Sequence, residues 1–189
     1  MATKDHQSEP IESASETLQR IFDGHGSVLG SQMADESSRY DVLKKTDFPK
    51  PQRTRRIAVA NQKGGVGKTT STVNTAAALA NKGAQVLVID MDPQGNASTA
   101  LGVFHASGEP SVYDVIEGRS DLGDVITVCP DFPTLDVVPA SIDLSGAELE
   151  VADLPNRNTL LKEALDLYLR QSDKHYDYVF IDCPPSLGL

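Results

Sequence analysis

The segment NQKGGVGKTTSTVN, from Asn61 to Asn74, combines closely spaced glycines, two lysines and a run of hydroxyl side chains. Glycine adopts positive φ easily and lets backbone N–H groups approach an anion, while the start of a helix adds partial positive charge. Lys68 is placed to reach the β and γ phosphates of a nucleotide, and the Thr69 hydroxyl to bind Mg²⁺. The segment therefore predicts a phosphate-binding loop made of Lys63, Gly64, Gly65, Val66, Gly67, Lys68, Thr69 and Thr70.

The loop departs from the standard spacing G-x-x-x-x-G-K-[ST]. Gly64 and Gly67 are closer together than that pattern requires, and a second lysine, Lys63, precedes them. A simple glycine turn would not account for Lys68, Thr69 and Thr70 in succession. The function of Lys63 is the question that this segment raises.

Three carboxylates follow apolar stretches of strand length. Asp90 ends such a stretch, Asp92 comes two residues later in IDMDPQGNAS, and Asp182 follows Tyr178–Ile181. Acids at the carboxyl ends of parallel strands lie where phosphates bind, so they can hold Mg²⁺, directly or through water, or orient an attacking water. We expect Asp90 and Asp182 at the metal and Asp92 at the water. A plain turn at Asp92–Gly95, or a turn capped by Asp182, is the alternative.

The elements that must position these residues follow from hydrophobic patterning. Residues 56–60 form a short apolar run, 68–82 an alanine-rich helix ended by Gly83, and 84–90 a continuous apolar strand. Together they predict one βαβ unit whose loop and strand ends share one edge of the sheet.

The remaining patterns extend this arrangement. They predict a helix at 111–118 with a capping box of Ser111 and Asp114, a strand at 135–140, helices at 141–153 and 158–171, and a strand ending on Asp182. The fold class is α/β: a P-loop NTPase with a doubly wound, mostly parallel sheet and helices on both faces.

Composition separates the first 54 residues from the rest. Residues 1–54 are rich in polar and charged side chains, which predicts a largely disordered tail with one possible helix at 10–22, whereas 55–189 form the domain. The chain has 189 residues and a net charge of −10, which opposes nonspecific nucleic-acid binding by its average surface. It contains no apolar run of membrane-spanning length and no secretory signal pattern, so we expect a cytoplasmic protein with free thiols at Cys129 and Cys183.

The motifs KGGVGKTT, DMDPQGN and FIDCPPSLGL together closely resemble those of the ParA-type, or Soj-like, partitioning ATPases of chromosomes and plasmids. The resemblance runs from about Arg56 to the last residue. It implies ATP and Mg²⁺ as cofactors, hydrolysis of ATP to ADP and phosphate, and a homodimer that encloses the nucleotide. It also implies that the complete protein binds DNA without sequence preference, associates with the nucleoid, and is stimulated by a ParB-type centromere-binding partner.

The same resemblance suggests what Lys63 does. In similar proteins, the matching lysine crosses the dimer interface and contacts the nucleotide of the other subunit. Lys63 and Lys68 would then stabilise phosphate charge, Thr69 and Asp182 would serve the metal, and Asp92 would position the hydrolytic water. The loops that follow Asp90 and Asp182 would act as switches.

The family pattern continues beyond Leu189, which implies that the domain is incomplete at this end. Two alternatives remain open at this point. One is a membrane-associated ATPase of the MinD type, which would carry a basic amphipathic helix at its C-terminus. The other is a non-catalytic fragment that acts as a scaffold.

Overall fold

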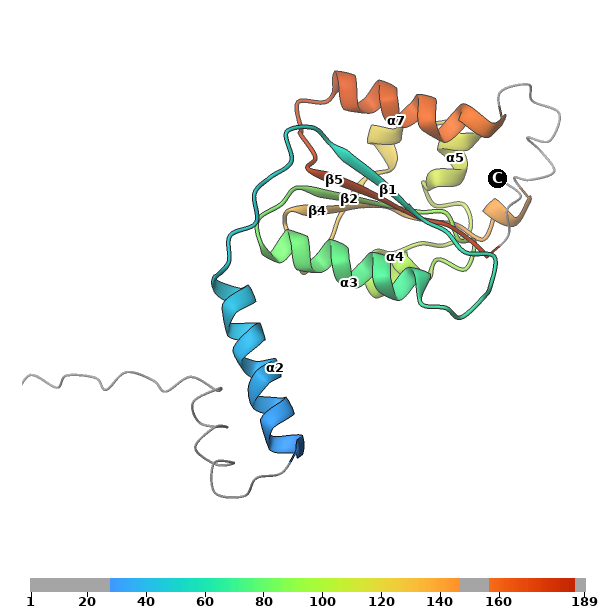
Figure 1. The fold of residues 1–189 in the computed structure, drawn as a ribbon. Coiled ribbons are helices and arrows are strands. Elements are labelled where there is room, and N and C mark those ends of the chain that lie inside the picture. Colours follow the sequence, from blue (N-terminus) through green and yellow to red (C-terminus); the bar gives the residue numbers. More distant parts are fainter. Residues whose placement is uncertain (1–27, 147–156, 186–189) are drawn as a thin grey trace, which may run out of the picture. The chain divides into compact units, whose positions relative to one another are not determined.

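The computed structural model describes residues 28–146 and 157–185 of the chain. The chain divides into two compact units, Met1–Phe48 and Pro49–Leu189. Figure 1 shows the elements of both units.

The first unit contains helix α2, Val28–Lys45. Lys44 and Lys45 occupy its last turn, where positive charge interacts favourably with the helix dipole. The sequence indicated no helix at residues 28–45, and the largely disordered tail expected for residues 1–54 stays a prediction. The apolar residues of α2 are few and form no clear stripe, so hydrophobic periodicity did not indicate this helix. The helix predicted at 10–22 lies outside the described residues.

The second unit is built on a sheet that, in the described part of the chain, has five strands in the order β1-β5-β2-β4-β3. All neighbours pair in parallel except β3 and β4. The strands are β1 (Arg55–Val59), β2 (Val86–Asp90), β3 (Thr127–Val128), β4 (Leu135–Val138) and β5 (Tyr178–Asp182). The predicted mostly parallel α/β sheet is confirmed.

Strand β5, the last in the sequence, lies between β1 and β2. Its final residue, Asp182, is in register with Val59 of β1 on one side and with Asp90 of β2 on the other. The carboxyl ends of three strands therefore meet at one edge, directly beside the glycine-rich segment that follows β1.

Helices cover both faces of the sheet (Figure 1). Helices α3 (Lys68–Asn81) and α4 (Asn96–Ala100) lie on one face, and α5 (Val112–Ile116) and α7 (Leu160–Gln171) on the other. Short 3-10 turns, η1 (Leu122–Val125) and η2 (Arg157–Thr159), complete the second layer. This is the doubly wound arrangement expected from the sequence.

The local signals explain how α3 and α5 begin and pack. Ala76 and Ala80 of α3 are buried, because small side chains let the helix approach the sheet closely. Helix α5 begins with the predicted capping box, in which the Ser111 backbone N–H donates to the Asp114 carboxylate at 3.0 Å. The helix predicted from Ser141 falls largely outside the described residues, which end at 146 on that side.

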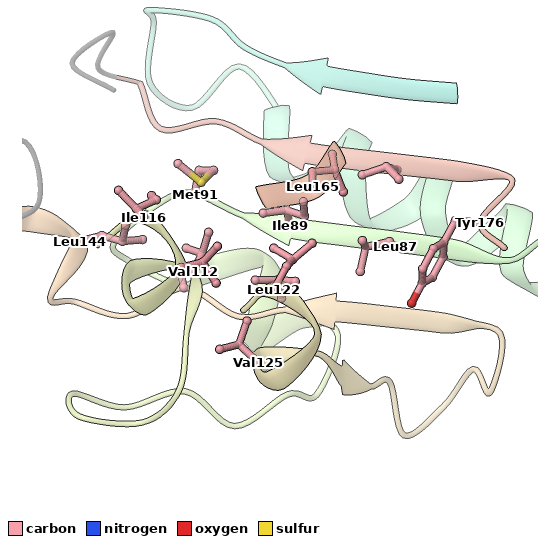
Figure 2. Close-up of a cluster of buried hydrophobic side chains, with 14 residues drawn as sticks. Leu87, Ile89, Met91, Val112, Ile116, Leu122, Val125, Leu144, Leu165 and Tyr176 are labelled. Atoms are coloured by element: carbon pink, nitrogen blue, oxygen red, sulfur yellow. The ribbon is translucent and has the colours of Figure 1, made fainter. Parts of the chain in front are cut away.

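Two apolar clusters fill the space on either face of the sheet. Figure 2 shows the one under α5 and α7, where Leu165 of α7 packs with Ile89 of β2 and Leu122 of η1. The other lies under α3 and includes Ala76, Val88 and Phe180. Because β2 and β4 are buried along their whole length, the centre of the sheet is a rigid support for the side chains at its edge.

Two further observations concern predictions made from composition. Within the described part of the chain, no helix has the length and apolar character needed to cross a membrane. Both cysteines are free, as expected; Cys129 is buried, whereas Cys183 is only partly covered.

Candidate functional site

The glycine-rich loop leads directly into α3 through backbone conformations that favour glycine. Gly65 has φ of +70° and Gly67 has φ of +88°, both in the left-handed region. An ideal Cβ at either position would meet nothing within 4 Å, so the need for glycine comes from φ and not from crowding. The Asn61 side chain accepts a hydrogen bond from the Lys63 backbone N–H at 3.0 Å, and this contact stabilises the start of the loop. The Lys63 side chain is exposed.

Asp182 is fully buried at the end of β5 and accepts two hydroxyl hydrogen bonds from α3. Thr69 Oγ1 donates to Asp182 Oδ2 at 2.7 Å, and Thr72 Oγ1 lies 3.1 Å from Oδ1. The two threonines are three residues apart, so they share one face of the helix. The first turn of α3 and the end of β5 are thereby joined at the residues predicted to serve a metal.

Asp90, also fully buried, organises the segment that follows β2. Its Oδ2 accepts hydrogen bonds from the backbone N–H of Ser98, at 2.8 Å, and from the Ser98 hydroxyl, at 2.7 Å. Its Oδ1 accepts the Asp92 N–H at 3.1 Å. Both oxygens are therefore engaged within the protein, and the metal-ligand role expected for Asp90 stays a prediction.

Asp92 is half-buried and begins the turn that leads into α4. Its Oδ1 accepts the Gln94 N–H at 3.0 Å, and its carbonyl accepts the Gly95 N–H at 2.8 Å. The turn given as the alternative interpretation of Asp92–Gly95 is present, and it holds Asp92 next to the Asp90–Asp182 pair. Structural and catalytic roles for this residue are compatible, because Oδ2 makes no hydrogen bond within the described residues.

The electrostatics of the two buried acids favour a cation at this edge. Burial, opposed by hydrogen bonds from Ser98, raises the pKa of Asp90. Burial also raises the pKa of Asp182; the Thr69 and Thr72 hydroxyls and Lys68 oppose that rise, and the charge on Asp92 adds to it. A divalent ion would relieve the cost of burying these charges.

The donor set suits Mg²⁺ better than a metal held by protein alone. In the part of the chain that the structure describes, no group of three His, Cys, Asp or Glu side chains is arranged to hold a metal. Mg²⁺ usually takes one or two protein oxygens and completes its shell with water and phosphate oxygens. Thr69 and Asp182 would provide such a partial set beside the glycine-rich loop, and this role stays a prediction because both Asp182 oxygens also accept hydrogen bonds within the protein.

A separate cleft of about 460 Å³ lies between α7 and the β1–β5 side of the sheet. Its lining is mostly apolar and includes Ile116, Leu161 and Leu165, although Cys183 and Pro184 border it near the carboxyl edge. An apolar lining does not suit phosphates, so this cleft is not the site that the motifs predict.

Some residues of the site were not identified from the sequence. Thr72 and Ser98 bind the two buried acids, and Asn61 braces the loop. The i, i+3 spacing of Thr69 and Thr72 is a signal that was available. Ser98 gave none, because its contact with Asp90 depends on α4 folding back on β2.

Comparisons with known proteins agree with this geometry. A family model described as an AAA domain matches residues 54–189. The sporulation initiation inhibitor protein Soj of Bacillus subtilis is 49% identical over 133 residues, which are 70% of this chain and 51% of that protein. The chromosome partitioning protein ParA of Caulobacter vibrioides is 47% identical over 70% of this chain and 49% of its own length. The chain thus spans about half the length of the curated relatives it matches.

Solved structures give the same result. A cobyrinic acid a,c-diamide synthase from Mycobacterium smegmatis, with bound ATP analog and magnesium, is 40% identical, with a TM-score of 0.62 over 71% of this chain and 53% of that one. A putative plasmid partition protein from Borrelia burgdorferi, bound to AMPPNP, is 29% identical, with a TM-score of 0.61 over 72% of this chain and 56% of that one. Because the family model matches most of its length, the chain belongs to the AAA domain family, and Soj and ParA proteins are among its relatives.

Proposed function

We propose that this chain is the nucleotide-binding part of an ATP-hydrolysing partitioning switch. In the complete protein, ATP and Mg²⁺ bind at the carboxyl edge of the sheet, and two subunits enclose the nucleotides. The ATP-bound dimer binds DNA without sequence preference at the nucleoid in the cytoplasm, and a ParB-type partner stimulates hydrolysis. The relatives named as chromosome partitioning proteins support this role.

One observation carries the proposal: the hydrogen bond of 2.7 Å between Thr69 at the start of α3 and Asp182 at the end of β5. It places a hydroxyl and a carboxylate side by side immediately after a glycine-rich loop. This combination suits a magnesium ion that also touches nucleotide phosphates. A buried acid used only for structure would not need to stand beside an anion-binding loop.

The roles of the side chains follow from their positions. The backbone N–H groups of residues 64–70 and the Lys68 side chain bind the phosphates. Thr69 and Asp182 would hold Mg²⁺, which would supply positive charge to the phosphates. Asp92 orients the attacking water, and Asp90 holds the Asp92 turn by accepting its N–H.

The exposed side chain of Lys63 suits a role across a dimer interface. A cation supplied by a second subunit stabilises developing phosphate charge much as an arginine finger does. Dimer formation would then depend on the γ-phosphate, and the dimer would dissociate after hydrolysis.

The first experiment measures nucleotide affinity and turnover of the chain together. Lys68→Ala should weaken binding of Mg·ATP about tenfold to a hundredfold, because it removes a charge-assisted contact, and should abolish turnover. Lys82→Ala is the matched control, since Lys82 caps the other end of the same helix. Equal affinity of Lys68→Ala and the original chain for Mg·ATP would contradict the proposed phosphate site. A folded chain with no nucleotide affinity would favour the scaffold alternative.

The second experiment concerns Lys63. Lys63→Ala should still bind Mg·ATP as a monomer but lose ATP-dependent dimerisation, measured by light scattering with a non-hydrolysable analogue. If Lys63→Ala dimerises at the same protein concentration as the original chain, Lys63 does not act on the nucleotide of the other subunit.

A further inference from the structure

The imidazole ring of His105 covers Gly95, the residue that precedes α4. An ideal Cβ built on Gly95 would lie 2.3 Å from Cε1, 2.6 Å from Nδ1 and 2.9 Å from Nε2 of this ring. Three ring atoms at such distances mean that the ring occupies the space where any other side chain would begin. Gly95 is accordingly buried, and its φ of +61° also favours glycine.

Two contacts fix the position of His105. Its Nε2 lies 2.8 Å from Oγ1 of Thr99 in α4, within hydrogen-bond distance. Two residues earlier, Val103 is buried, and its N–H donates to the Ser98 carbonyl at 2.9 Å. The loop after α4 therefore returns over the start of that helix and holds the ring in place.

Gly95 is connected directly to Asp92. The Gly95 N–H donates to the Asp92 carbonyl at 2.8 Å, and the Gly95 carbonyl accepts the Thr99 N–H at 2.9 Å. His105 thus contacts two of the three residues in this hydrogen-bonded path, Gly95 by packing and Thr99 by its ring nitrogen. The ring therefore packs against the residue that closes the Asp92 turn.

We propose that His105 is a positioning residue that clamps the Asp92–Gly95 turn and so keeps Asp92 in its place for hydrolysis. The inference rests on the proposed function for its catalytic consequence, whereas the clamp itself is a property of the fold. His105 touches neither of the buried acids Asp90 and Asp182 in the described structure, so its effect passes through Gly95 and Thr99. Loss of the ring should therefore affect turnover and leave nucleotide binding in place.

Amide hydrogen exchange of the 189-residue chain tests the clamp without any nucleotide. His105→Ala should raise the exchange rates of the Gln94 and Gly95 amides at least fivefold, because both donate within the turn. His105→Gln, which can still reach Thr99, should restore much of the protection. His175→Ala is the control, since that exposed histidine lies before β5. Unchanged exchange at Gln94 and Gly95 in His105→Ala would overturn the proposal.

A double mutant tests the packing of the ring on Gly95. Gly95→Ala should lower Tm through both the clash with His105 and the positive φ, but in the His105→Ala background only the φ strain remains. We expect the Tm loss caused by Gly95→Ala to be at least halved in that background. An equal loss in both backgrounds would show that the ring moves aside at little cost and so does not clamp Gly95, and would overturn the proposal.

Turnover of Mg·ATP tests the consequence for Asp92. His105→Ala should lower kcat about fivefold with KM within about twofold of the original, and His105→Gln should recover part of kcat. An unchanged kcat in His105→Ala would refute the positioning role. Absence of turnover in the original chain would instead count against the proposed function, and the exchange and Tm experiments would still decide on the clamp.

Discussion

Buried aspartates lie at two places along the sheet, and their partners differ. At the carboxyl edge, Asp90 and Asp182 accept hydrogen bonds only from hydroxyl and backbone N–H groups. Nearer the amino ends of the strands, Asp136 of β4 accepts from both Lys174 and Tyr176 through Oδ2. Within the described residues, a lysine therefore neutralises Asp136, whereas neither acid at the carboxyl edge forms a salt bridge.

The surroundings of Asp136 are those of a structural ion pair. Tyr176 is fully buried, and burial together with the hydrogen bond to Asp136 raises the pKa of its phenol. The Tyr168 hydroxyl lies 3.4 Å from that of Tyr176 and extends the network to α7. Oδ1 of Asp136 is buried without a partner in the described structure, a small cost that the charged lysine offsets.

The comparison shows that a buried acid with a structural role and buried acids suited to a ligand differ in their hydrogen-bond donors. Lys174 and Tyr176 both donate hydrogen bonds to Asp136, and the lysine balances its charge. This carboxylate therefore links β4 to the segment before β5. Where only hydroxyl and amide donors are present, two neighbouring carboxylates keep raised pKa values and favour an external cation. The carboxyl edge is thus destabilised in the absence of a ligand, as functional sites often are.

The largest expected effect tests the structural role of Asp136. Asp136→Ala should lower the free energy of unfolding by about 3 kcal/mol, because Tyr176 and Lys174 lose their shared acceptor in a buried position. Urea unfolding measures this loss. Affinity for Mg·ATP, measured on the folded fraction, should stay within about twofold of the original. A large loss of affinity with little loss of stability would break the distinction between the two regions.

Asp182→Asn tests the proposed metal-binding role of the carboxyl edge. It should weaken binding of Mg·ATP about tenfold, since a neutral amide serves the metal poorly, without the stability loss expected for Asp136→Ala. Isothermal titration with and without Mg²⁺ separates the metal effect from nucleotide contacts. Asp177→Asn is a suitable control, because Asp177 is equally buried but precedes β5 and caps the Gln85 N–H. Equal affinity losses in both variants would contradict the assignment.

A smaller effect is expected from Thr72→Val, which preserves shape but removes one hydroxyl from Asp182 Oδ1. The free energy of unfolding should fall by about 1 kcal/mol, and the pKa of Asp182 should rise further. Thr134→Val, which removes a hydroxyl bond to the Ala80 carbonyl, should cost a similar free energy with no effect on Mg²⁺ dependence. Identical Mg²⁺ dependence in both variants would argue against Thr72 as a partner of the site.

The smallest effect is a pH dependence of stability. Because the pKa of Asp182 is raised in the folded state, the folded protein holds this proton more tightly than the unfolded chain does. Its contribution is fully present below the unfolded value, about 3.9, and is lost as the pH rises through the folded value.

Other acids act with the opposite sign, since hydrogen bonds lower the pKa values of Asp143 and Asp166. The difference between the original chain and Asp182→Asn isolates the group of interest. The variant should gain stability relative to the original chain as the pH rises from about 4 to 7. A constant difference over this range would show that Asp182 has no raised pKa.

Much of the fold was predictable because strong local signals agree with the tertiary structure. The continuous apolar run that forms β2, the glycines before α3 and the capping box of α5 each identify an element and its start. Helix α2, the two-residue strand β3 and the short helix α4 were missed. The short elements depend on contacts with the rest of the chain, and α2 lacks an apolar stripe.

The site was predictable in its residue types but not in its connections. The loop, Asp92 and Asp182 follow from motif and strand position. Ser98 and His105 do not, because their contacts arise only when α4 and the following loop fold back over β2. Residues proposed to position the site therefore carry weaker sequence signals than the residues proposed to react.

A crystal structure of the chain with Mg²⁺ and a non-hydrolysable ATP analogue tests the central claim most directly. The account predicts phosphates against the backbone N–H groups of the 64–70 loop, and a magnesium ion in contact with the Thr69 hydroxyl and the Asp182 carboxylate or its bound water. An analogue bound elsewhere, or a loop with bound phosphate while Asp182 remains remote from any metal, would contradict it.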